Sequence, residues 1–119
     1  KATEYERHAF ALELSYLRDF SSEDITRRSL DEMRRLQNIP IARTQQWERA
    51  LRDAFPSVKA GDRISGVNRP GMGVQFLTNG QLTGDIRDVE FARLFFGIWL
   101  LPDTSEPRLR QALLAQATP

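Results

Sequence analysis

The segment over residues 91–101, FARLFFGIWLL, restricts the fold of this chain more than any other. Arg93 is its only charged residue, and Gly97 is the only residue in it that is neither large nor apolar, although 28% of the whole chain is charged. A helix that spans a bilayer needs about 20 apolar residues, and this segment is about half as long, so it is not a membrane span. A helix that is apolar nearly all round is a buried helix. We therefore expect a core helix over residues 89–100, which Asp88 caps and Pro102 ends. Within this helix, Phe95 is the first candidate for a residue that also lines a cleft.

The composition fits one domain over residues 1–119 and excludes several kinds of chemistry. A chain of 119 residues can bury one core. Its 17 basic and 16 acidic residues nearly cancel, so nucleic acid is not indicated as a partner. There is no cysteine, and the single histidine, His8, lacks the neighbours that a metal cage or a Ser-His-Asp relay needs. We therefore expect neither a metal nor a cofactor.

Hydrophobic periodicity predicts an α+β fold. An apolar side chain occupies every second position from Phe10 to Tyr16, which is typical of a strand, here over residues 9–18. The pair Asn79-Gly80 predicts a hairpin. The other expected elements are helices over 22–37, 40–55 and 104–117 and strands over 62–68, 73–78 and 81–85. Strands joined by hairpins, with helices in separate blocks, favour an antiparallel sheet that is covered on one face. The first strand has no neighbouring strand in the sequence, so we expect a segment upstream of residue 1 to pair with it.

The two helices that follow the first strand differ in their polar faces. Ser21 begins the first helix as its N-cap, with Asp24 in the position of a capping box. This helix carries four arginines within helical reach of three acids, which favours a solvated, salt-bridged face over a nucleic-acid surface. The residues concerned are Arg27, Arg28, Arg34 and Arg35, with Asp24, Asp31 and Glu32. In the second helix, the apolar residues Ile41, Trp47, Leu51 and Phe55 fall near one face.

A few weakly polar groups among apolar ones are candidates for a binding site. The Ser29 hydroxyl lies on the apolar stripe that includes Met33, where it either bonds back to its own helix or points into a cavity. The Tyr16 phenol would lie between sheet and helix, either as a core anchor or as a ligand contact. At the end of the first strand, a solvated rim residue is favoured for Arg18 over a clamp for a ligand carboxylate.

Several segments together resemble the bacterial chalcone-isomerase-like proteins, over about residues 10–114. They are FALELSYLRDFSSEDITRRSLDEMRRL, LRDAFPSVKAGDRISGV, VQFLTNGQLTGDI and EFARLFFGIWLLPDTSEPRLRQALL. The resemblance implies an open-faced β-sandwich, in which helices cover a curved antiparallel sheet and leave an apolar cleft between the two layers. Plant enzymes of this fold cyclise chalcones, whereas other members lack that activity and some bind fatty acids.

The resemblance also implies an origin and a missing part. Bacterial relatives are often exported, so we expect a periplasmic or otherwise exported protein. The family pattern includes strands upstream of residue 1, one of which carries an arginine that serves both the enzymes and the fatty-acid binders. Since the chain begins at Lys1 without a methionine, we expect it to be N-terminally incomplete. The vacant sheet edge is then expected to pair with a second copy or with a separate N-terminal fragment.

The catalytic residues of the enzymes transfer poorly onto this chain. Thr83 matches the threonine after the hairpin, but Ser21 and Arg28 fall near the catalytic tyrosine and asparagine. We therefore expect a non-catalytic protein that binds a small apolar ligand, such as a fatty acid, between sheet and helices. The expected contacts are Tyr16, Ser29, Met33, Thr83 and Phe95. One alternative is an isomerase, an intramolecular lyase, acting on a chalcone-like phenolic substrate. The other is a structural protein whose own side chains fill the cleft.

Overall fold

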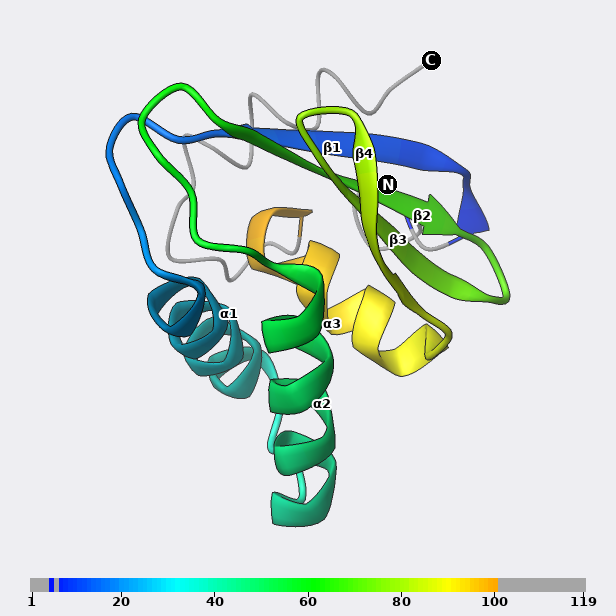
Figure 1. Ribbon diagram of the computed structural model, residues 1–119. Helices are drawn as coiled ribbons and strands as arrows, with labels where there is room; N and C mark the ends of the chain where they lie inside the picture. The colour runs from blue at the N-terminus through cyan, green and yellow to red at the C-terminus, as the bar shows by residue number, and fades with distance from the viewer. Residues whose placement is uncertain (1–4, 6, 101–119) are drawn as a thin grey trace.

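The computed structural model describes residue 5 and residues 7–100 of the chain. This part forms a four-stranded antiparallel sheet, in the order β1-β2-β3-β4, and three α-helices. All three helices lie on the same face of the sheet (Figure 1). The elements are β1 (Phe10–Ser15), α1 (Ser22–Leu36), α2 (Ile41–Ala54), β2 (Arg63–Arg69), β3 (Gly73–Thr78), β4 (Gln81–Ile86) and α3 (Val89–Leu100). The predicted α+β class, with an antiparallel sheet covered by helices, is confirmed. The expected helix over 104–117 and the stop at Pro102 lie outside the described residues.

The first strand is shorter than expected, and it does have a partner in this chain. β1 pairs antiparallel with β2, so that Leu12 lies opposite Gly66 and Leu14 opposite Ile64. This partner is not a neighbour in the sequence, because α1 and α2 together form the connection that returns the chain to the edge of β1 (Figure 1). β1 is an edge strand of the described sheet, so pairing of its other side with a segment upstream of residue 1 stays a prediction. Association of the sheet edge with a second copy or a separate fragment stays a prediction.

The apolar run forms the centre of the core, as its composition predicts. Every residue of α3 from Leu94 to Leu100 is buried, and α3 packs on both β3 and α1. Its aromatic rings contact rings from other elements edge-on: the centroids of Phe95 and Phe76 lie 5.0 Å apart, and those of Phe96 and Phe10 lie 4.8 Å apart. Edge-to-face pairs of this kind are worth about 0.5–1.5 kcal/mol beyond their buried area.

One residue of the expected apolar face of α2 lies in solvent. Trp47 and Leu51 are buried, but the side chain of Ile41 is 78% exposed. Ile41 occupies the first turn of α2, which extends away from the sheet (Figure 1). The spacing of apolar residues correctly gave the buried face of α2, but it could not show how far the helix extends beyond the core.

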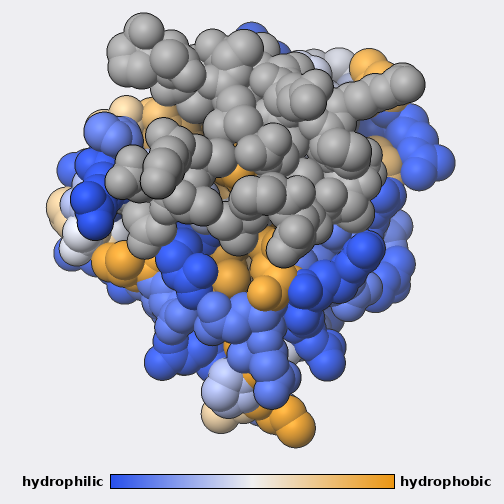
Figure 2. All heavy atoms as spheres, turned by 180° about the vertical axis from the view of Figure 1, so that it is seen from behind, coloured by the Kyte–Doolittle hydropathy of each residue, from blue (hydrophilic) through white to orange (hydrophobic). Residues whose placement is uncertain are grey.

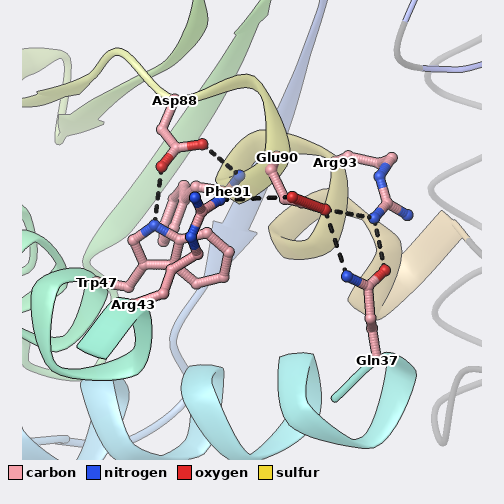
Figure 3. A network of polar contacts seen from close by, with 7 residues as sticks. All are labelled: Gln37, Arg43, Trp47, Asp88, Glu90, Phe91 and Arg93. Atoms are coloured by element: carbon pink, nitrogen blue, oxygen red, sulfur yellow. Dashed lines mark hydrogen bonds and ion pairs between the residues drawn. The ribbon is translucent and has the colours of Figure 1, made fainter. Parts of the chain in front are cut away.

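Both predicted helix caps and the predicted hairpin are confirmed. The Ser21 hydroxyl accepts a hydrogen bond from the Asp24 backbone N–H, at 3.1 Å. The Asp88 carboxylate accepts one from the Phe91 N–H, also at 3.1 Å, and its other oxygen accepts the indole N–H of Trp47 at 2.9 Å (Figure 3). In the β3–β4 turn, φ is +50° at Asn79 and +86° at Gly80. This left-handed geometry at both central residues is the one that Asn-Gly pairs favour in tight hairpins.

A polar network on Glu90 joins the three helices at the end of the molecule that carries Asp88. The Glu90 carboxylate accepts from Arg93 at 3.1 Å, from Gln37 at 3.3 Å and from Arg43 at 3.5 Å (Figure 3). Arg93 also donates to the side-chain oxygen of Gln37, at 2.7 Å. The hydrogen bonds from Arg93 and then Gln37 hold the pKa of Glu90 below its ordinary value. Since this network is largely exposed, its ion pairs add orientation rather than much stability.

The contact between α2 and β4 gives a direct test of this packing. A Cβ added to Gly84 would overlap the side chain of Ala54 and would lie 3.0 Å from the Ala54 Cα. Gly84→Ala should therefore lower the free energy of unfolding by about 1–3 kcal/mol in urea titrations. In the double variant with Ala54→Gly, the loss should be smaller than the sum of the two single losses, because the overlapping methyl group is gone. A Gly84→Ala protein as stable as the parent would contradict the described contact.

Candidate ligand-binding cleft

A cleft of about 270 Å³ opens where the end of β1 meets α1 and α3. Its size is just under the range of about 300–1,000 Å³ that is usual for small-molecule sites. The residues that line it come from the end of β1 and the loop after it, from one side of α1, from the end of α2 and from the middle of α3. They are Leu14, Ser15, Tyr16, Phe20, Ile25, Arg28, Ser29, Glu32, Phe55, Phe95, Ile98 and Trp99.

Local periodicity brings these side chains to one place. Leu14 and Tyr16 are two residues apart at the end of β1 and therefore point to the same side, toward the helices. On α1 and α3 the lining residues recur at intervals of three and four, as one face of a helix requires. Apolar surface is visible on the back of the molecule between strongly hydrophilic flanks (Figure 2). The result is a mainly apolar cleft with a few polar groups among its walls.

Phe95 belongs to both the core and the cleft. Its side chain is only 2% exposed, and its ring packs against those of Phe76, Trp99 and Phe55, with centroid distances of 5.0, 5.3 and 6.0 Å. The part of Phe95 that the core leaves uncovered forms part of the cleft wall. The sequence-based assignment of Phe95 to a cleft therefore agrees with its position, while ligand contact stays a prediction.

Tyr16 is the clearest polar candidate in the cleft. Burial raises the pKa of its phenol, and the nearby Arg28 guanidinium lowers it in part. The phenol is therefore protonated at neutral pH and can donate a hydrogen bond. The Tyr16 hydroxyl lines the cleft and has no hydrogen-bond partner among the described residues. The ring itself packs edge-on against Phe20, with centroids 5.7 Å apart.

Ser29 resolves one of the alternatives that the sequence leaves open. Its half-buried side chain lines the cleft from α1. In α2, by contrast, the Thr44 hydroxyl bonds back to the Pro40 carbonyl, at 3.1 Å. The Ser29 hydroxyl makes no such bond to its own helix or to any other described residue, so the back-bonded alternative is not observed. Tyr16 and Ser29 thus place in the same cleft two hydroxyl groups that have no hydrogen-bond partner among the residues that the structure describes.

Two expected contact residues do not line this cleft. Met33 is fully buried in the core. Thr83 lies on β4, at the edge of the sheet opposite to β1, where its hydroxyl is 3.1 Å from that of Thr78 and 3.4 Å from the Phe76 carbonyl. Thr83 lies at a register shift between β3 and β4, where Gly84 is opposite Phe76 and Leu82 is opposite Leu77, and no sequence pattern revealed this irregularity. Of the five expected contacts, the structure brings together Tyr16, Ser29 and Phe95.

Arg28 is a cleft residue that the sequence analysis assigned to a salt-bridged face. That prediction is confirmed for two other arginines of α1: Arg27 pairs with Asp24 at 2.8 Å and Arg35 with Glu32 at 3.5 Å. Arg28 instead lines the cleft. The sequence signal that could have identified Arg28 as a cleft residue is its position directly before Ser29. Side chains of adjacent residues on a helix point only about 100° apart around the axis, so both can border one cleft.

Other kinds of site have no counterpart in the part of the chain that the structure describes. It holds no group of three or more histidine, cysteine or acidic residues that could bind a metal ion. Within residues 7–100, no helix has both the length and the apolar character needed to cross a bilayer.

A sheet with all three helices on one face, and an apolar cleft between the two layers, defines an open-faced β-sandwich. The crystal structure of a fatty-acid binding protein from Arabidopsis thaliana has the same fold, with a TM-score of 0.71. The superposition covers 96% of this chain and 59% of the plant protein, at 11% sequence identity. At that identity, the likeness is one of fold.

The sequence gives the family directly. A family model described as chalcone isomerase-like matches residues 1–115, and the protein belongs to this family. An uncharacterized protein of Haemophilus influenzae is 30% identical over 73 residues, which are 61% of this chain and 36% of that protein. The chain therefore matches about a third of the bacterial relative and rather more than half of the plant protein.

The environment of Tyr16 leads to a prediction about its ionisation. Because burial favours the neutral phenol, its pKa should lie above the ordinary value of 10.0 in an NMR titration of the ring carbon that bears the hydroxyl. The stability that this phenol contributes is present below about pH 10 and is lost as the pH rises through the folded-state pKa. Arg28→Met should raise the pKa further, because it removes a nearby positive charge, whereas the control Arg34→Met should not. A midpoint at or below 10, or one that Arg28→Met leaves unchanged, would contradict this environment.

Proposed function

We propose that this protein binds a small, mainly apolar molecule, such as a fatty acid, in the cleft between β1, α1 and α3, and that it is not an enzyme. The observation that carries this proposal is the combination of aromatic and aliphatic walls with two hydroxyl groups that have no partner in the described chain. Burial of apolar ligand surface contributes about 25 cal/mol per Å², from which the cost of association must be subtracted. The hydroxyl groups of Tyr16 and Ser29 would then fix the orientation of the ligand.

Two further observations support a binding role. The fold is shared with a plant protein whose name describes it as binding fatty acids. Ser21, which the family resemblance places near the catalytic tyrosine of the enzymes, caps α1 through its hydroxyl in this protein. A group held in a cap is a poor substitute for a phenol in a reaction centre, which favours binding over catalysis.

The proposal predicts that the purified protein retains a lipid. Mass spectrometry of an organic extract should show an acyl compound in near-stoichiometric amount, and titration with a fluorescent fatty acid should saturate. Extracts and titrations that repeatedly give no signal would contradict the proposed function.

A variant that fills the cleft should abolish binding without unfolding the protein. Ser29 lines the cleft from α1 and is only half-buried, so Ser29→Phe should place its ring in the space that the ligand needs. We expect at least a tenfold loss of fluorescent fatty-acid binding, with the melting temperature nearly unchanged. Gln45→Phe, which adds the same ring to an exposed position of α2, is the matched control and should bind normally. Normal binding by Ser29→Phe would place the ligand elsewhere.

A further inference from the structure

The part of the cleft wall that follows β1 lies outside the helices and the sheet. Tyr16 and Phe20 line the cleft from this loop, which runs beside the chain that leads from α2 into β2 (Figure 1). The Tyr16 N–H donates to the Asp62 carbonyl at 2.9 Å, and the Phe20 N–H donates to the Val58 carbonyl at 3.0 Å. The two cleft residues are therefore positioned through the backbone of residues 58–62.

Asp62 fixes the shape of that neighbouring segment. Residues 59–62 form a turn in which the Asp62 N–H donates to the Lys59 carbonyl at 2.9 Å. The Asp62 carboxylate closes the same turn, because one of its oxygens accepts the Lys59 N–H at 2.8 Å. Gly61, inside the turn, has a φ of +95° and donates its N–H to the Tyr16 carbonyl at 2.8 Å. Both hydrogen bonds of the Tyr16 backbone thus end on a turn that the Asp62 carboxylate holds.

The second oxygen of the Asp62 carboxylate joins this turn to the sheet. It accepts the side-chain N–H of Asn79 at 3.1 Å, while the side-chain oxygen of Asn79 accepts the Arg63 N–H at 2.9 Å. The sequence pattern assigns Asn79 only to the β3–β4 hairpin, whereas its side chain also bridges to the segment beside the cleft. The hydrogen bonds from the Lys59 backbone and then from Asn79 hold the pKa of Asp62 below its ordinary value.

A second carboxylate strengthens the contact between the loop and the turn. Asp19, in the loop after β1, accepts the Ala60 N–H at 3.0 Å. Asp62 itself is not among the residues that line the cleft. Any effect of Asp62 on a bound molecule must therefore pass through the residues that it holds, of which Tyr16 is the one with a polar group.

We propose that Asp62 is a positioning residue of the cleft, whose carboxylate, held by Lys59 and Asn79, keeps Tyr16 in the cleft wall. This inference rests on the proposed function and adds to it residues that do not touch the ligand. A wall that is already ordered favours binding, because the ligand does not have to order the loop. Without the carboxylate, only a fraction of the molecules would hold the loop in the binding arrangement, and the apparent affinity would fall by that fraction.

The test measures fluorescent fatty-acid binding and amide hydrogen exchange on the same variants. Asp62→Ala removes both acceptor oxygens and should weaken binding about tenfold, because the ligand must then order the loop itself. It should also speed the exchange of the Tyr16 and Gly61 N–H groups, but not that of the N–H groups of β3, which is paired on both sides. A general loss of stability would speed both sets. Asp53→Ala removes the same charge from an exposed position of α2 and should leave binding and exchange unchanged.

A milder variant gives the same decision if Asp62→Ala proves unstable. Asn79→Gly keeps the left-handed turn, since glycine adopts the φ of +50° readily, and removes only the side chain. It should weaken binding about threefold, the scale of one lost hydrogen bond. In the double variant, the loss should be smaller than the product of the two single losses, because Asp62 and Asn79 act through one contact.

The outcomes separate this inference from the proposal on which it rests. If the parent binds the fatty acid and Asp62→Ala binds it equally well, the positioning role is overturned and the apolar binding function stands. The same holds if binding falls while the exchange of the Tyr16 N–H stays unchanged. If the parent itself binds no fatty acid, the proposed function fails, and the role of Asp62 in binding fails with it.

Discussion

The burial of α3 is the constraint on which the rest of the structure depends. This helix is apolar on nearly every side, so the protein must surround it, and the sheet alone can cover only one side. β3 and α1 pack directly against it. The indole of Trp47, from α2, is hydrogen-bonded to the Asp88 cap that begins α3. The fold therefore buries one helix, α3, against elements from both halves of the chain.

The cleft follows from the same constraint. α1 meets α3 while the chain between β1 and α1 bends away at Tyr16, whose N–H and carbonyl bond to Asp62 and Gly61 at 2.9 and 2.8 Å. Beside this bend, the described residues leave a cleft whose wall includes Phe95 and Trp99 of α3. The walls of this space include polar groups, among them Tyr16, Arg28 and Ser29. At 11% identity, what this chain shares with the plant protein is the fold.

Much of this fold could be predicted from sequence because its signals are local. The apolar run, the Ser21 and Asp88 caps and the Asn79-Gly80 turn each depend on a few adjacent residues, and each is confirmed. The pairing of β1 with β2 could not be predicted in this way, since it joins segments that two helices separate. The candidate site likewise combines residues that local sequence patterns predict with residues that only the three-dimensional structure reveals. Tyr16, Ser29 and Phe95 share the cleft because they lie on apolar faces, whereas the position of Arg28 in the cleft wall, over the Phe20 ring, becomes visible only in three dimensions.

The central claim is that a ligand occupies the cleft, and its position can be measured directly. Isotope-filtered NOE spectroscopy on labelled protein with unlabelled decanoate reports which protein protons lie near the acyl chain. The account predicts cross-peaks from the chain to the side chains of Phe95, Ile98 and Trp99, which form the α3 wall of the cleft. Cross-peaks confined to other surfaces, such as the small depression beside Met72 at the β2–β3 hairpin, would contradict it.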